Sequence, residues 1–207
     1  MEIELPKVPL EAGLGPDNPP CPACGEPLVP WVELPGGTGV AHRCEACELG
    51  LVGPFIGPAE ALADLDFLSD DSAVVTFPNR HSLTASFTGG GWSELLGEPN
   101  CRFTPRSIRD LAAGRDQVLG RLRWRPARAI VSAWQSTINL FTFGHNLALG
   151  LFGRTPAAPA RRLWQRVLDG FITIVLAIPA IPVAILLEVV GAILGRGGAY
   201  RGELVVL

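Results

Sequence analysis

The sequence predicts an α+β protein, and three observations carry that prediction. Two cysteine pairs near the start indicate a small metal-bound module, β-branched runs between helix-forming segments indicate a mixed α/β region, and a long uncharged stretch indicates apolar helices. A chain of 207 residues can bury one sizeable core, but hardly two complete enzyme domains. We therefore expect unequal parts, namely an extended or disordered segment 1–18, a metal module 19–56, an α/β region 57–124, an apolar helical insert 125–198 and a final strand 199–207.

Charge is distributed unevenly along the chain. Residues 1–100 carry 15 acidic and 3 basic side chains and residues 101–207 carry 5 and 14, so the net charge of −3 is the sum of −12 and +9. The basic half also holds the longest apolar runs, which favours an anionic membrane surface over nucleic acid as a partner. Nucleic acid remains a lesser alternative because arginines crowd at Arg121, Arg123, Arg125 and Arg128. The first residues show no secretory signal, so we expect the cytoplasmic face of the cell membrane.

The most specific motif is C-x2-C-x19-C-x2-C, formed by Cys21, Cys24, Cys44 and Cys47. This spacing is typical of a zinc ribbon, because two intervening residues let both thiolates of a pair reach one tetrahedral ion. Between the pairs, 28–34 and 39–43 are predicted to be the two strands of a hairpin. Four protein ligands leave no position for water or substrate, so we expect a structural Zn²⁺ that folds the module and does not catalyse.

The sequence also allows other roles for the cysteines and for one histidine. The two pairs could instead be redox or disulfide pairs, although a reducing compartment favours a metal. His42 could replace a cysteine as ligand, but an ordinary strand residue is the simpler interpretation. Cys101 has no neighbouring partner and is expected to be a buried thiol.

The region after the module has recognisable helix and strand signals. Pro58 at a first helical position begins a short helix, and Thr104 is a good N-cap for a second helix that ends at Gly114. Three strands are predicted from apolar or alternating runs, at 73–77, 117–124 and 199–206.

Three motifs in this region are V-V-T-F-P-N-R-H-S-L at 74–83, Gly91-Trp92 and F-T-P-R-S-I-R-D-L at 103–111. They resemble the fifth strand, the following loop and the next helix of class I S-adenosylmethionine (SAM) methyltransferases, some of which begin with a four-cysteine ribbon. The resemblance implies that the three predicted strands are strands five, six and seven of a reduced Rossmann-like sheet. The last two would form an antiparallel hairpin at its edge.

The half of that fold that binds SAM is missing from the sequence. A SAM site needs a glycine-rich turn after the first strand and an acidic residue after the second. Only about 25 residues separate Cys47 from Ala73, too few for four strands with their crossovers. Relatives often carry a histidine just before F-T-P, where this chain has Pro99 to Arg102, so no catalytic residue can be assigned. We therefore expect an internally shortened relative without a complete SAM site.

The apolar insert predicts contact with a membrane. Phe171–Leu187 holds no charge and, at about 1.5 Å per residue, would cover roughly 26 Å, slightly short of a hydrocarbon core of about 30 Å. Pro179 and Pro182 should kink it. The segment could cross the membrane once, lie in one leaflet with Arg161, Arg162 and Arg166 at the headgroups, or be buried in a soluble core. The prolines, the short length and Glu188 favour the leaflet arrangement.

A second apolar stretch, Ile138–Phe152, is interrupted by His145, which could bind a ligand but is more simply an interior histidine.

The first functional hypothesis is a membrane-associated, methyltransferase-like binding or accessory module without SAM-dependent catalysis of its own. The alternatives are an active methyltransferase on a lipid-linked or membrane-proximal acceptor, and a membrane-anchored zinc-ribbon interaction protein. Membrane lipids are the expected partners and a protein is a further one. Hydrolase and nucleoside-triphosphatase motifs are absent.

Overall fold

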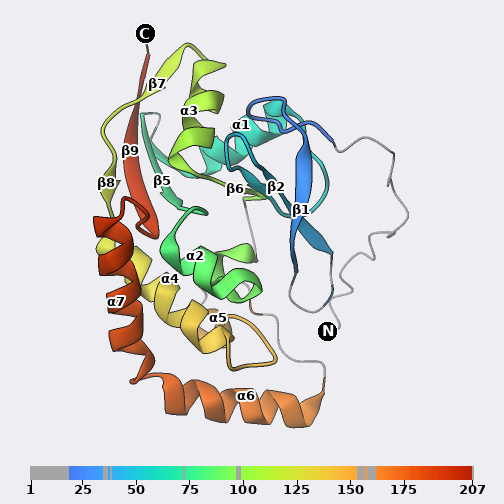
Figure 1. The fold of residues 1–207 in the computed structure, drawn as a ribbon, viewed down its shortest axis with the longest axis vertical. Coiled ribbons are helices and arrows are strands. Elements are labelled where there is room, and N and C mark those ends of the chain that lie inside the picture. The colour runs from blue at the N-terminus through green and yellow to red at the C-terminus, as the bar shows by residue number, and fades with distance from the viewer. Residues whose placement is uncertain are drawn as a thin grey trace.

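The computed structural model describes residues 19–206, apart from 35, 36, 38, 72, 97, 98, 153–156 and 158–161. The predicted extended segment 1–18 and Arg161 therefore lie outside the described residues. The α+β class is confirmed, because two antiparallel sheets occupy the upper half of Figure 1 and the longest helices the lower half.

The first sheet contains the cysteine-bearing part of the chain. The predicted hairpin pairs Leu28 with Cys44 and Glu33 with Val40. Two short strands extend it, and one of them comes from well beyond the predicted module. In spatial order the strands are β1 (Leu28–Glu33), β2 (Val40–Cys44), β3 (Gly50–Leu51) and β6 (Cys101–Arg102).

The second sheet is organised around the last strand, β9 (Ala199–Val206). This strand pairs antiparallel with β5 (Val74–Pro78) on one side and with β7 (Gln117–Leu119) and β8 (Arg123–Trp124) on the other. β4 (Ser69–Asp71) pairs with β5 at the opposite edge.

The prediction of one continuous strand over 117–124 is wrong. Leu119 faces Leu204 and Arg123 faces Arg201, so four steps along one strand oppose three along β9. One extra residue therefore interrupts the pairing as a bulge does. The amide of Gly120 still donates to the carbonyl of Glu203 at 2.7 Å, which keeps the interrupted segment on the sheet.

Short helices surround the sheets, and the two that the sequence predicts begin at the expected positions. α1 (Pro58–Phe67) has its proline in the first turn, and α3 (Pro105–Ala113) has Thr104 as an N-cap in a reciprocal capping box. α2 (Leu83–Thr88) follows β5 and is capped by Ser82. Two 3₁₀ turns follow α2, namely η2 (Gly89–Gly91) and η3 (Ser93–Leu95).

One hydrophobic core joins the cysteine-bearing part to the rest of the sheets. Leu28 and Leu49 from the first part pack in the same cluster as Phe77, Ile108 and Leu204 from the second. The predicted regions 19–56 and 57–124 thus share their core.

Four helices form the lower half of Figure 1: α4 (Pro126–Asn139), α5 (Leu147–Leu151), α6 (Leu163–Leu176) and α7 (Ala180–Ile193). α7 packs along α4, whereas α6 extends across the bottom of the molecule. Among the described residues no single helix has the length and apolarity to cross a membrane, but α6 and α7 would pass that test as a pair, bent by 70° where they meet. The bend falls just before Pro179, in the uncharged run where a kink is predicted.

Candidate metal centre

The two cysteine pairs lie on turns of the same construction. In each pair the amide of the first cysteine donates to the carbonyl five residues ahead, at 2.7 Å after Cys21 and at 2.8 Å after Cys44. The residue after each pair is left-handed, with φ of 82° at Gly25 and 63° at Glu48. Glycine adopts this conformation without strain, but a glutamate does so only where other contacts hold it.

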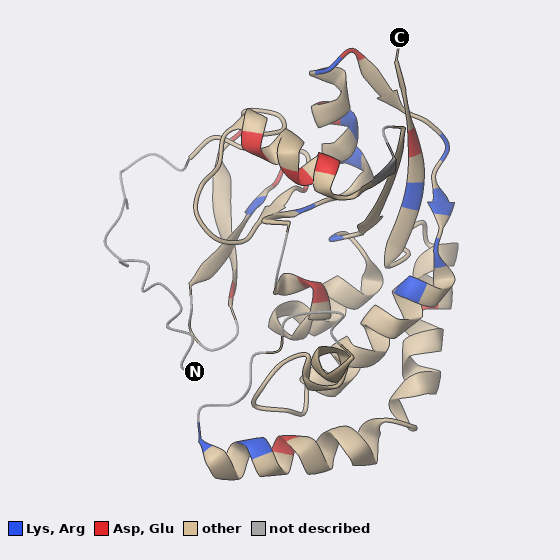
Figure 2. Ribbon diagram, turned by 180° about the vertical axis from the view of Figure 1, so that it is seen from behind, with Lys and Arg blue, Asp and Glu red and all other residues tan. Residues whose placement is uncertain are grey.

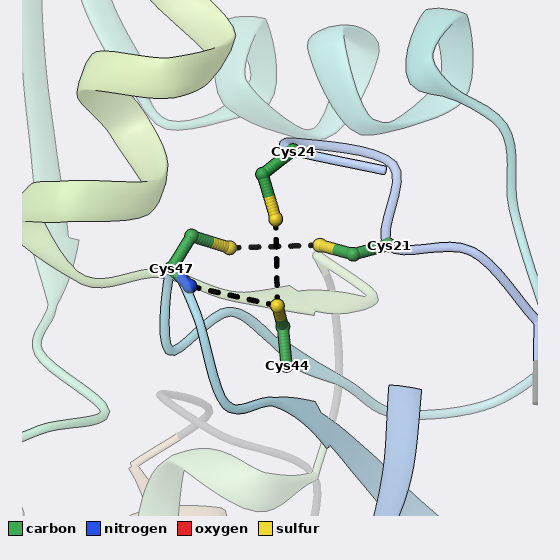
Figure 3. Close-up of side chains that lie close together, drawn as sticks. All are labelled: Cys21, Cys24, Cys44 and Cys47. Carbon is green, nitrogen blue, oxygen red and sulfur yellow. Dashed lines mark hydrogen bonds between the residues drawn. The ribbon is translucent and has the colours of Figure 1, made fainter. Parts of the chain in front are cut away.

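The four sulfur atoms converge between the two turns (Figure 3). Cys21 Sγ lies 3.5 Å from Cys47 Sγ, Cys24 Sγ lies 3.4 Å from Cys44 Sγ, and all four lie within 4.8 Å of one another. A tetrahedral ion bonded to sulfur at about 2.3 Å would separate its ligands by about 3.8 Å. The cluster therefore has the donor set and the spacing to hold one metal ion, as the sequence predicts.

Crowding of the thiols shifts their protonation. The hydrogen bond from the Cys47 thiol lowers the pKa of Cys21 to about 5, and the same bond raises the pKa of Cys47. Burial raises the pKa of Cys24 to about 11. The thiolate of Cys21 is thus stabilised at the expense of that of Cys47, and a bound cation would favour the thiolate form of the ligands that hold it.

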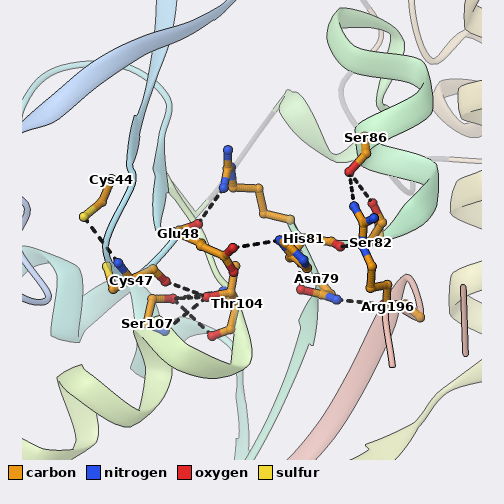
Figure 4. Close-up of polar contacts among 12 residues, drawn as sticks. Cys44, Cys47, Glu48, Asn79, His81, Ser82, Ser86, Thr104, Ser107 and Arg196 are labelled. Atoms are coloured by element: carbon orange, nitrogen blue, oxygen red, sulfur yellow. Dashed lines mark hydrogen bonds and ion pairs between the residues drawn. The ribbon is translucent and has the colours of Figure 1, made fainter. Parts of the chain in front are cut away.

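The second turn is anchored to the α/β region (Figure 4). The Thr104 hydroxyl donates to the carbonyl of Cys47 at 2.9 Å, and the Arg80 guanidinium donates to the carbonyl of Glu48 at 2.9 Å. His81 Nδ1 also lies 3.0 Å from the carboxylate of Glu48. These contacts explain how Glu48 keeps its left-handed conformation, and they connect the metal centre to α3 and to the loop after β5.

A polar cavity of about 450 Å³ adjoins this turn and is lined in part by Arg43, Arg80 and Arg196. Arg80 lies 4.3 Å over the ring of Trp31. Burial, and then the like charge of Arg43, lower the pKa of Arg80 to about 10. Two glutamates also line the cavity, so its charges are largely balanced. This group of arginines was not identified from the sequence. The available signal was that Arg43 and Arg80 are the only arginines in the acidic residues 1–100.

The remaining cysteine and two histidines stand apart from the metal centre. Cys101 is buried in β6, as predicted, and burial raises the pKa of its thiol. His42 packs edge-on against Phe55 with ring centroids 4.9 Å apart, and burial lowers its pKa. Burial also lowers the pKa of His145. Among the described residues, the group able to hold a metal consists of the four cysteines alone.

A helix of a soluble protein usually buries apolar side chains and exposes charged ones. Helix α6 shows the reverse distribution. All of its residues are described, and Asp169 is the one that is buried. The Asp169 carboxylate accepts hydrogen bonds from the amides of Phe143 (2.7 Å) and Gly144 (2.8 Å), which attaches α6 to the loop between α4 and α5. Ile174, in contrast, is 77% exposed. Sequence reasoning noted the uncharged run but did not identify Asp169 as the attachment point.

Helix α7 shows the same reversal. Its buried residues are Ala180, Ala184, Glu188 and Gly191, which recur at intervals of three or four and so share one face. The carboxylate of Glu188 accepts from the Thr84 hydroxyl at 2.6 Å and from the amide of Gly198 at 2.7 Å. The charged group that interrupts the apolar run at Glu188 therefore lies inside the protein. The large apolar residues exposed on α7 are Ile181, Val183, Ile185, Leu186, Val189, Val190 and Ile193.

The described residues thus offer one candidate metal centre and, on α6 and α7, one extended apolar surface. Comparison of the chain with protein families, with curated proteins and with solved structures found no match.

Proposed function

We propose that this chain is a membrane-associated binding module that carries a structural Zn²⁺ and has no SAM-dependent catalysis of its own. The observation that carries the proposal is the reversed polarity of α6 and α7, which bury Asp169, Glu188 and small residues while they expose large apolar side chains.

Exposure on this scale is costly in water. Ile174, Ile178 and Ile193 are 77%, 78% and 79% exposed, and Phe171 is 64% exposed, all on α6, on α7 or in the short turn between them. Single exposed apolar residues need no explanation, but a contiguous apolar surface marks an interaction site. Apart from Glu188, the face that α7 turns inward consists of alanine and glycine, as in helices that pack against one another inside a bilayer.

The geometry favours insertion into one leaflet. Each helix has 14 residues and is therefore about 21 Å long, less than the hydrocarbon thickness of about 30 Å, and the 70° bend prevents the two from acting as one rod. Helices of this kind lie in the interface with their apolar side chains in the acyl region. Arg162 and Arg166, at the start of α6, would then reach the headgroups.

The metal assigned to the cysteine cluster is Zn²⁺. Thiolate ligands in a compact four-sulfur arrangement suit this ion, and four protein ligands close the site to substrate. Its contribution would be to join the two turns, because each turn supplies two of the four sulfurs. Purified protein should contain one zinc per chain, and serine at Cys44 and Cys47 together should abolish it.

We further propose descent from class I methyltransferases. The antiparallel pairing of β7 and β9 at the edge of the second sheet is what the resemblance implies for strands six and seven. The described part of that sheet has only antiparallel pairs, whereas a SAM-binding half would need parallel β-α-β units. Calorimetry on zinc-loaded protein in detergent should therefore detect no SAM binding. Saturable micromolar binding would instead support the active-enzyme alternative.

Membrane association is tested by flotation with neutral phosphatidylcholine vesicles. Wild-type protein should float with the vesicles, and the double variant Ile174→Glu/Ile193→Glu should stay in the dense fraction, because carboxylates would replace exposed apolar groups. Phe67→Glu is a matched control, since Phe67 is 61% exposed but lies on α1. Equal flotation of all three proteins, or none by the wild type, would refute the proposal.

A further inference from the structure

A second cavity, of about 420 Å³, lies against the second sheet, where it is lined by residues of β5, β9 and the segment 121–125, and it has four arginines in its lining: Arg121, Arg123, Arg125 and Arg201. Among the described residues that line it, Glu203 is the single acidic one. The formal charge of the lining is therefore strongly positive, unlike that of the cavity beside the metal centre. The proposed metal site and apolar helices do not account for this cluster.

The strand pattern places these arginines together. Arg121, Arg123 and Arg125 occupy alternate positions and are exposed, whereas Leu122 and Trp124 between them are half-buried. Alternate residues of an extended chain share a face. The amide of Arg125 also bonds to β9, which keeps this segment extended beyond β8.

The arrangement brings like charges close together. Arg123 is directly opposite Arg201 in the β8–β9 register, and like charges in such a pair are destabilising. Within the described chain, no carboxylate forms an ion pair with Arg121, Arg123 or Arg125. An anionic ligand would offset this repulsion, and guanidinium groups suit phosphate because their planar N–H groups can donate two parallel bonds.

The position of the cavity indicates which kind of phosphate-bearing ligand could reach it. Trp124, beside the arginines, packs at the connection between α7 and β9, since a β-carbon built on Gly197 would lie 2.8 Å from its ring. In Figure 2 the basic residues of β8 and β9 follow the same edge of the molecule as α7. The strands that carry these arginines therefore continue the edge of the molecule that α7 forms.

We propose that the arginine cavity binds the phosphate group of an anionic phospholipid when α6 and α7 are inserted in a membrane. This inference rests on the proposed membrane association and adds a lipid preference to it. A nucleic-acid strand suits the site less, because single strands bind through exposed aromatic rings on which bases stack, and Trp124 is half-buried.

The test compares vesicles of phosphatidylcholine with vesicles that also contain phosphatidylglycerol. Wild-type protein should bind the anionic vesicles more tightly, by about fivefold for each arginine that reaches the headgroups, and added salt should reduce the difference. The triple variant Arg121→Gln/Arg123→Gln/Arg125→Gln should lose most of this preference and keep its binding to neutral vesicles. Arg106→Gln/Arg109→Gln, exposed on α3, should behave as wild type.

Each outcome separates the two proposals. Loss of binding to both kinds of vesicle in the wild type would refute membrane association itself. An anionic preference that the triple variant keeps would overturn the arginine cavity and leave membrane association standing. A thermal transition at or above the wild-type temperature shows that the triple variant folds, because removal of like charges costs the fold little.

Two further probes fix the source of the phosphate. Glycerol 3-phosphate titrated into detergent-purified protein should bind weakly. Saturable binding that depends on the three arginines but brings no vesicle preference would retain the phosphate site and overturn its assignment to lipid. Arginine-dependent binding of a single-stranded oligonucleotide, tighter than binding to anionic vesicles, would also overturn that assignment.

Discussion

Replacing Asp169 with alanine should weaken the attachment of α6 to the loop between α4 and α5. The Asp169 side chain is 0% exposed and accepts the amides of Phe143 and Gly144 at 2.7 and 2.8 Å. Hydrogen bonds to a charged group contribute about 1.5–3 kcal/mol each, so Asp169→Ala should lower the local stability of this attachment by about 3–6 kcal/mol. Asp169→Asn should lose roughly half of that, because an amide offers one acceptor oxygen and turns its NH₂ group toward the other backbone N–H.

Hydrogen exchange in detergent micelles measures this loss directly. A change of about 3 kcal/mol corresponds to exchange roughly a hundredfold faster at the amides of Phe143 and Gly144, with little change in the sheets. Val167→Ala is the matched control in the same helix, since Val167 is 68% exposed. Unchanged protection in Asp169→Ala, or an equal loss in Val167→Ala, would refute the view that α6 is held by its one buried carboxylate.

Three further predictions concern the helix interface, the metal centre and pH. Ala184→Leu should lower stability by about 1–3 kcal/mol in thermal unfolding, because Ala184 is 0% exposed on α7, which packs along α4, and a larger buried side chain would overpack the site. Thr104→Ala should cost about 2 kcal/mol and speed the loss of zinc to a chelator, because it removes a helix cap and a bond to the carbonyl of Cys47. Hydrogen bonds from Arg115 lower the pKa of Asp66, so their stabilisation is present above the unfolded pKa and is lost as pH falls through the folded one. Arg115→Gln should therefore reduce stability by less than about 1 kcal/mol at neutral pH, with no difference from wild type in acid, as measured by urea unfolding.

The cysteine cluster and most strands could be predicted because their signals are local. The spacing of Cys21, Cys24, Cys44 and Cys47 limits where the sulfurs can lie, and the alternation around 199–206 identifies a strand without knowledge of its neighbours. The bulge between β7 and β8 could not be predicted, since it depends on the length of the opposing segment of β9.

The contacts that hold the second turn of the metal centre were also beyond sequence reasoning. Glu48 is bonded by Arg80 and His81, which are more than thirty positions further along the chain. The residues next to Glu48 in the sequence do not indicate these distant partners. The left-handed backbone of Glu48 is explained only by the contacts that they make. The same holds for Asp169, whose partners are backbone amides that any sequence would supply.

The charge asymmetry of the chain acquires a physical role if α6 and α7 enter an anionic membrane. The acidic residues of α1 lie in the upper part of Figure 2, away from α6, whereas basic residues lie at the start of α6 and along the edge that continues α7. The field of such a surface would repel the first region and attract the second, within a Debye length of about 8–10 Å. Under the proposed membrane association, both effects would orient the molecule with its apolar helices toward lipid before any of them inserts. The cysteine module, which shares its core with the acidic half, would then face away from the membrane, where a protein partner could reach it.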